Sequence, residues 1–230
     1  MPDIHITKRA LADALKSLMS EMPFDKITVT QICDRCSMNR KSFYYHFKDK
    51  YDLVNWIFDT EILALIEQES LYSLQPHNHS LEQILQNHET FSSSTADYHA
   101  GLDLFCEYFY QNRHFYRAAL QIHGQNSFTD HFRSFLQPIL KYRLETLFQQ
   151  YSQKPVKKQY MTFYVDILTD TFLLAMERWV KEKNAMPAEE FVSMLITLVY
   201  NASLALSQKY SEQHSVKTVN SNILKQDVTC

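Results

Sequence analysis

The chain has 230 residues, of which 21% are charged, and a formal net charge of −3, so it is long enough for one large or two small domains with a buried core. No apolar run approaches the roughly 20 residues needed to span a bilayer. The N-terminus lacks the basic and then apolar segments of a signal peptide. We therefore predict a cytoplasmic protein without a membrane partner.

The scarcity of glycine and proline indicates the fold class. Gly101 and Gly124 are the only glycines, and the chain has six prolines. Dinucleotide-binding and phosphate-binding loops need several glycines close together, so neither type of loop is expected. Few Gly and Pro also disfavour the many tight turns of an all-β fold. The composition predicts an all-α protein, and no cofactor is expected.

Charge is distributed unevenly along the chain. Residues 1–50 have more Lys and Arg than Asp and Glu, and the remainder has the opposite excess. We call residues 1–50 the head and residues 51–210 the body. A basic head on an acidic body is expected when one end of a protein binds phosphate groups.

The head has the local signals of three helices. Thr7 is expected to cap a first helix that runs to about Met22 and ends before Pro23. Thr28 starts a capping box at the beginning of a short second helix, because the Gln side chain three residues later can bond back to its amide. Asn39 is expected to cap a third helix through about His46.

Helical patterns continue through the body. Asp49 opens a long helix that passes Leu63, and Ser127 is expected to cap a later one. Residues 211–230 are polar and without periodicity, which predicts a flexible tail. Further helices are predicted near residues 81–90, 97–111, 112–123, 127–150, 156–183 and 187–209.

The second and third helices are joined by a turn at Ser37-Met38, which is the spacing of a helix-turn-helix. In this motif the third helix lies in the DNA major groove while its neighbour braces it. Arg40 and Lys41 stand at its start, where side chains reach base edges, and Ser42 allows close approach. Donors to phosphates follow: Tyr44, Tyr45, His46, Lys48 and Lys50.

Residues 28–53 resemble the signature of the TetR family, most specifically from Phe43 to Leu53. The resemblance implies an all-helical, DNA-binding homodimer. The turn departs from the family pattern at Ser37, where Gly is usual, and Lys41 replaces a frequent small residue. By motif position the resemblance implies that two groups of residues contact the DNA backbone: Thr28 and Thr30 from the second helix, and Tyr44, Tyr45, His46 and Lys50. It implies contacts with bases or phosphates from Asn39, Arg40, Lys41 and Ser42.

Residues 115–128 resemble the regulatory domain of a TetR-type subgroup named after regulators of dihydroxyacetone kinase operons. This subgroup includes activators and repressors. The resemblance therefore implies a regulatory domain while the effector and the sign of regulation stay open.

Two patterns could bind metal or carry redox chemistry. Cys33 and Cys36 have the spacing of a redox or zinc motif, but they lie within the second helix, where structural packing is the preferred interpretation. The ten histidines are scattered; His77 and His79 share a polar stretch, whereas His114, His123 and His131 are eight or nine residues apart. We predict no metal site, with a metal-responsive regulator that uses histidines as an alternative.

Two apolar features of the body have more than one interpretation. Residues 98–116 contain seven aromatic side chains, which line a ligand cavity or pack as core. The helices near 156–183 and 187–209 have apolar faces broader than one domain core requires, which favours a homodimer over a monomeric core.

These patterns together predict a dimeric transcription regulator that is not an enzyme. The head at 1–50 would read a two-fold symmetric site in double-stranded DNA, and the body at 51–210 would bind an unknown small-molecule or protein effector that changes the separation of the two heads. The other alternative is a protein-interaction module that keeps the TetR shape without reading DNA.

Overall fold

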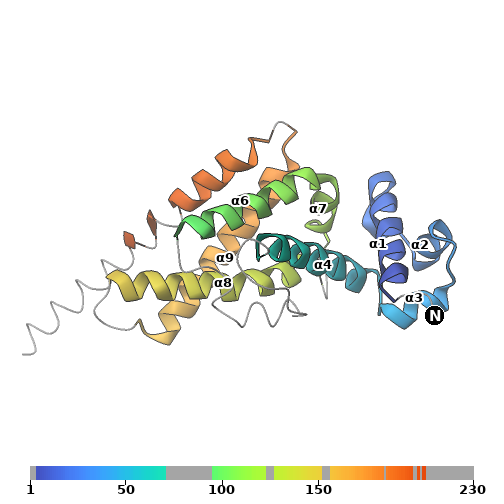
Figure 1. The fold of residues 1–230 in the computed structure, drawn as a ribbon, viewed down its shortest axis with the longest axis horizontal. Coiled ribbons are helices and arrows are strands. Elements are labelled where there is room, and N and C mark those ends of the chain that lie inside the picture. The colour runs from blue at the N-terminus through green and yellow to red at the C-terminus, as the bar shows by residue number, and fades with distance from the viewer. Residues whose placement is uncertain are drawn as a thin grey trace, which may run out of the picture. The chain divides into compact units, whose positions relative to one another are not determined.

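The computed structural model describes residues 4–70, 95–122, 127–151, 156–183, 185–198, 201–202 and 204–205. Within these ranges the regular structure is helical and contains no strand, which confirms the predicted all-α fold (Figure 1). The chain divides into two compact units. The first comprises residues 1–135 and 173–192, and the second comprises residues 136–172 and 193–230.

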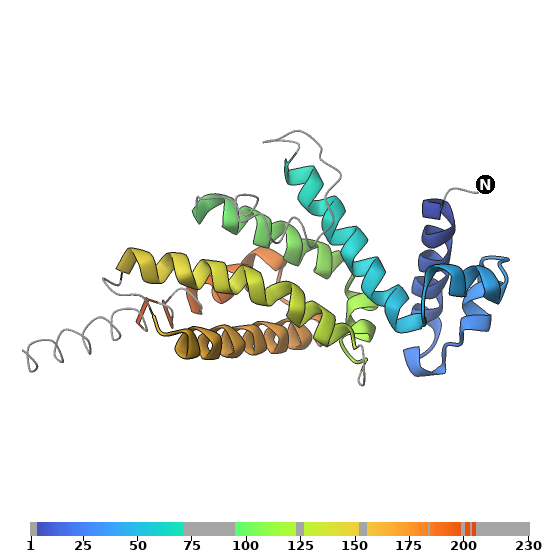
Figure 2. The same cartoon turned by 90° about the horizontal axis from the view of Figure 1, so that it is seen from below.

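The head forms a cluster of short helices in the first unit, blue in Figures 1 and 2. It consists of α1 (Ile4–Glu21), the 3-10 turn η1 (Phe24–Lys26), α2 (Val29–Arg35) and α3 (Arg40–His46). Apolar side chains from all three α-helices are buried between them: Leu11, Leu15, Leu18, Ile32, Phe43 and Phe47. Burying each such side chain contributes about 1.5–3 kcal/mol, so this small core holds the three helices together.

The long helix α4 (Lys50–Ser70) follows the head directly. Asp49 caps it as predicted, because its Oδ1 accepts the amide hydrogens of Tyr51 and Asp52 at 2.8 Å each. Asp52 in turn accepts the Lys48 amide at 3.0 Å. These bonds satisfy amide groups that the first turn of a helix leaves without partners.

Aromatic side chains form the core of the first unit behind the head. The elements here are α4, α6 (Thr95–Gln111), α7 (Arg113–Ala119) and the start of α8 (Phe128–Tyr151). The rings of Phe109 and Tyr116 stack with centroids 3.8 Å apart, and Phe58 meets Phe128 edge-on at 5.4 Å. These four side chains are at most 1% exposed. Two of them, Phe109 and Tyr116, belong to the predicted aromatic cluster, and their burial favours the core interpretation for these two.

The second unit contains the rest of α8, residues 158–172 of α9 (Lys158–Lys181) and the helical residues 193–198. Phe148 stacks on Tyr164 at 6.0 Å, and the Gln137 amide donates to Asp166 at 3.0 Å. Buried aliphatic side chains complete this core: Leu140, Leu144, Met161, Val165 and Leu168.

The predicted cap at Thr7 is wrong. Helix α1 begins at Ile4, and Thr7 lies within it with only 8% of its surface exposed. Packing against the rest of the first unit outweighs the weak preference of threonine for a helix end. Elsewhere α7 is shorter than the predicted 112–123 segment, whereas Ser127 caps α8 as expected by accepting the Asp130 amide at 3.2 Å.

Several predictions lie outside the described residues. These are the helix near 81–90, the tail at 211–230, and the side chains of His77, His79 and His123. None of the described helices is long and apolar enough to cross a membrane.

Candidate nucleic-acid interface

Local hydrogen bonds position both helices of the predicted helix-turn-helix. Thr28 Oγ1 accepts the Gln31 amide at 3.2 Å, and Gln31 Oε1 accepts the Thr28 amide at 2.8 Å. Asn39 Oδ1 accepts the Ser42 amide at 2.8 Å. Both predicted caps are therefore confirmed, and each contributes about 1 kcal/mol to its helix.

The turn between α2 and α3 has a backbone geometry that usually requires glycine. Ser37 has a φ of 56°, in the left-handed region. Its amide donates to Asp34 O at 3.2 Å, and the next amide, of Met38, donates to Cys33 O at 2.8 Å. These two bonds make a Schellman motif that ends α2 and turns the chain toward α3. The Cβ atom of serine makes this conformation cost about 1–2 kcal/mol.

Helix α3 presents its polar side chains outward while Phe43 packs into the head core. Tyr44 and Tyr45 are 51% and 77% exposed, which is unusual for such large rings. The other exposed members of the predicted set are Thr28, Thr30, Asn39, Arg40, Lys41 and Lys48, and the half-buried members are Ser42, His46 and Lys50.

Two pairs of side chains contact each other on the surface of α3. The Arg40 guanidinium lies 3.5 Å from the Tyr44 hydroxyl and 5.8 Å from its ring centroid, one helical turn along. The rings of Tyr45 and His46 meet edge-on at 4.9 Å. Burial lowers the pKa of His46, and the charge of Lys8 lowers it further. Cationic and aromatic groups of this kind suit contacts with phosphates and base edges.

Lys50 has a different environment from the other predicted residues. Its ammonium donates to the carbonyl oxygens of Phe24 and Ile27 at 2.8 Å each and of Asp25 at 3.3 Å. Three acceptors match the three hydrogens of an ammonium. Lys50 thus ties the start of α4 to η1, a role that the sequence did not indicate because the partners lie 23 to 26 positions earlier.

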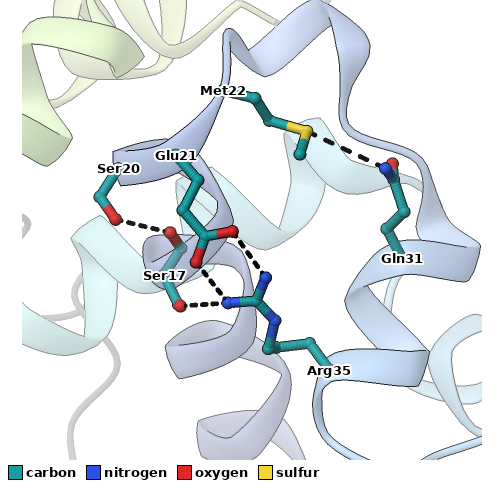
Figure 3. Close-up of polar contacts among 6 residues, drawn as sticks. All are labelled: Ser17, Ser20, Glu21, Met22, Gln31 and Arg35. Atoms are coloured by element: carbon teal, nitrogen blue, oxygen red, sulfur yellow. Dashed lines mark hydrogen bonds and ion pairs between the residues drawn. The ribbon is translucent and has the colours of Figure 1, made fainter.

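An exposed ionic contact fixes α2 against α1 (Figure 3). The Arg35 guanidinium donates to both carboxylate oxygens of Glu21, at 2.6 and 2.7 Å, and to Ser17 Oγ at 2.7 Å. The bond from Arg35 lowers the pKa of Glu21. This bidentate geometry restrains rotation of α2, the helix that braces α3. Opposite charges in the sequence do not reveal such a pair, because its members are 14 residues apart.

The structure supports the packing interpretation of the two head cysteines. Cys33 is 1% exposed, and the thiol of Cys36 donates to Ile32 O at 3.3 Å. Burial raises the pKa of both thiols, which disfavours the reactive thiolate.

The histidines of the described segments do not gather into a ligand set. No group of three His, Cys, Asp or Glu side chains in those segments could hold a metal ion. His131 instead lies 2.6 Å from Asp59 and packs its ring on Phe58.

A polar junction connects the head to the helices behind it. The Lys16 ammonium of α1 donates to Glu61 Oε1 of α4, and the Tyr116 hydroxyl of α7 donates to Glu61 Oε2 at 3.1 Å. The same ammonium lies 5.1 Å from the ring centroid of Phe115. Burial and the Glu61 charge raise the pKa of Tyr116, so its hydroxyl stays a donor. We call Lys16, Glu61 and Tyr116 the α1–α4–α7 junction.

Two family models match most of the described chain. The model described as bacterial regulatory proteins, tetR family, matches residues 11–57, and TetR_C_8, a transcriptional regulator C-terminal region, matches residues 96–201. The first covers the helix-turn-helix and the start of α4. The chain belongs to the TetR family of transcriptional regulators, and it is therefore a regulator and not an enzyme.

The chain is also similar to individual regulators. Over 67 residues it is 33% identical to the HTH-type dhaKLM operon transcriptional activator DhaS of Lactococcus lactis subsp. lactis (strain IL1403); the match covers 29% of this chain and 36% of that protein. The chain thus matches about a third of the relative's length. This similarity confirms the resemblance to the subgroup of dihydroxyacetone kinase operon regulators.

Solved structures share the fold. The dihydroxyacetone kinase operon activator DhaS aligns with a TM-score of 0.54 and 20% identity, over 86% of this chain and 96% of that one. FadR of Thermus thermophilus, a TetR family repressor in complex with lauroyl-CoA, aligns with a TM-score of 0.56 and 13% identity, over 84% and 93% of the two chains. An activator and a repressor therefore share this architecture.

Proposed function

We propose that this regulator binds a specific double-stranded DNA sequence through α3, acts as a homodimer, and responds to an effector bound by its body. The main support for DNA binding is that α3 exposes its polar side chains while its neighbours hold it in place. Its exposed side carries Arg40, Lys41, Tyr44 and Tyr45, while capped α2 and the Arg35 contact brace it. A helix held in this way can enter a major groove without losing its support.

Under this proposal most of the predicted residues contact DNA, and Lys50 helps to hold the helices in position. Arg40 and Lys41 reach base edges from the start of α3, whereas Tyr44, Tyr45, His46 and Lys48 bind phosphates. Asn39 and Thr28 use their side-chain oxygens as caps and can still meet phosphates with their exposed surface. Lys50 acts by positioning, because carbonyl oxygens occupy its donors.

The test begins by selecting duplexes that bind the wild-type protein from a random-sequence library. Arg40→Ala and Lys41→Ala should weaken binding to the selected duplex, and at least one should lose about 1–3 kcal/mol of discrimination between that duplex and a scrambled one. Lys26→Ala, which removes an exposed charge in η1 outside the helix-turn-helix, is the control. If both α3 variants discriminate like the wild type, α3 does not read the sequence.

Exposed apolar side chains in the second unit support the homodimer. Phe163 and Ile167 of α9 are 60% and 49% exposed, and Met194 and Leu198 in the helical residues 188–198 are 51% and 56% exposed. Large apolar side chains left in water at helical spacing favour burial against another surface. A two-fold partner that presents the same helices covers them and sets the separation of the two heads.

A charge at this surface tests the dimer. Leu198→Glu should give monomer or aggregate in light scattering at micromolar concentration, and binding to a two-fold symmetric duplex should fall although the head is unchanged. Thr197→Glu adds the same charge at an adjacent exposed position whose hydroxyl donates to Ser193 O within the same helix. A folded Leu198→Glu protein that stays dimeric would place the interface elsewhere.

The α1–α4–α7 junction supports effector control. Lys16 belongs to the head and Tyr116 to the body, so a shift of α7 against α4 changes the contacts that hold α1. An effector that prefers one arrangement shifts the population of DNA-binding dimers. FadR of Thermus thermophilus, which has a similar fold, is in complex with lauroyl-CoA, and this supports a small-molecule effector. The effector of this chain can be sought by thermal-shift screening of small-molecule pools. Binding to bacterial DNA also implies a cytoplasmic location.

A further inference from the structure

The ammonium of Lys8, a residue of α1, lies next to the C-terminal end of α3. Its side chain extends from α1 and is half-buried, and its ammonium lies 5.6 Å from the ring centroid of Phe47 and 5.5 Å from that of Trp56. Phe47 is the residue that ends α3, and its ring meets Trp56 of α4 at 5.6 Å. The two rings therefore hold the stem and charge of Lys8 in one position.

The charge of Lys8 has no anionic partner among the described residues. No carboxylate in those segments lies within ion-pair distance of its ammonium, whereas Lys16 pairs with Glu61 and Arg35 pairs with Glu21. The aromatic faces attract the cation without neutralising it. Lys8 thus carries a charge that the two rings restrain and that no carboxylate of the described residues pairs with.

His46 lies beside this charge. Its ring centroid is 6.4 Å from that of Phe47, on which Lys8 rests. The pKa of His46 is lowered by burial and by Lys8, so the two groups repel each other's positive charge in the free protein. An anion within reach of both donors would offset this repulsion and accept a hydrogen bond from each.

We propose that Lys8 is a further DNA-contacting residue, which binds a backbone phosphate together with His46 at the end of α3. The inference rests on the proposed DNA-binding function. A phosphate is the appropriate anion because His46 already belongs to the predicted backbone contacts, and because the Phe47 and Trp56 rings restrain Lys8 before DNA arrives. The alternative role is structural: a cation near the C-terminal end of α3 favours the helix by itself.

The salt dependence of DNA binding distinguishes these roles. The decisive variant is Lys8→Met, which keeps an apolar stem against the two rings and removes the charge; Lys8→Gln serves if Lys8→Met does not fold. Binding to the selected duplex and to a scrambled duplex of equal length is measured over a range of NaCl concentrations. Controls are Lys8→Arg, which retains the charge, and Lys141→Gln, which removes an exposed charge from α8 outside the head.

A phosphate contact predicts that Lys8→Met makes the negative slope of log affinity against log salt shallower, by about 0.9 per bound protomer. The affinity should fall similarly on both duplexes, because a backbone contact does not read bases. Lys8→Arg should keep the wild-type slope, and Lys141→Gln should leave it unchanged. An unchanged slope for the charge-removing variant, with or without a loss of thermal stability, overturns the inference. Wild-type protein without sequence preference would contradict the proposed function instead.

Discussion

Replacing Ser37 by glycine should stabilise the protein. Ser37 occupies the left-handed position of the Schellman motif that ends α2, with a φ of 56°. Its amide and that of Met38 both donate to α2 carbonyls, at 3.2 and 2.8 Å. Neither bond involves the Ser37 side chain. The substitution therefore removes the clash of Cβ with the backbone while leaving the hydrogen bonds of the turn in place.

The expected magnitude follows from two opposing effects. The left-handed conformation costs a residue with a Cβ about 1–2 kcal/mol, which glycine avoids. Glycine also has more freedom in the unfolded chain, which reduces the gain by about 0.4–1 kcal/mol. The net increase in the free energy of unfolding lies between about 0 and 1.6 kcal/mol, with a midpoint of about 0.8 kcal/mol. For a chain of this size that corresponds to a rise in Tm of about 2 °C.

Calorimetry and circular dichroism on the full chain measure this change. Ser37→Ala is the matched control, because it loses the hydroxyl and keeps Cβ, so it should show no comparable rise in Tm. Base preference should be unchanged in both variants, since Ser37 contributes no side chain to α3. The reasoning is refuted if Ser37→Gly is no more stable than Ser37→Ala, because the backbone strain would then be absent.

The remaining predictions concern the junction, the cysteines and a helix cap. Tyr116→Phe removes the bond to Glu61 and should lower the free energy of unfolding in urea by about 1.5–3 kcal/mol, the range for hydrogen bonds to charged groups; an unchanged stability would mean that this bond contributes nothing. Replacing Cys33 and Cys36 by Ala should leave DNA binding insensitive to oxidant and chelator with a modest loss of stability, because both thiols pack in the head; loss of regulation in a folded variant would restore the redox or metal interpretation. Asn39→Ala should cost about 1 kcal/mol and weaken amide-exchange protection at the start of α3, and full protection would show that the cap is dispensable.

Signals that act within a few residues were readable from the sequence. Thr28 with Gln31, Asn39, Asp49 and Ser127 each cap a helix as predicted, because a capping side chain bonds to amides two or three positions away. The family signature after Thr28 likewise depends on a contiguous segment. These local features were sufficient for the all-α fold class, the helix-turn-helix and the recognition of the family.

Thr7 shows where local reasoning failed. A threonine near the start of a helical pattern is a reasonable cap, yet it lies within α1 and is buried. Helix-end preferences amount to about a kilocalorie per mole, and the packing of a whole helix face exceeds that amount.

Only the tertiary structure decided which charged side chains are not already bonded within the protein. Lys50 was predicted to contact DNA, and Arg35 is another basic residue of the head, but distant carbonyls and Glu21 bind their donors. Lys8, which no motif singles out, keeps its charge on two rings. The sequence alone determined the fold class and the positions of α2 and α3 through short-range hydrogen bonds and apolar periodicity. The partners of each charge lie many residues apart in the chain, and only the packing of α1, η1, α2 and α4 brings them together.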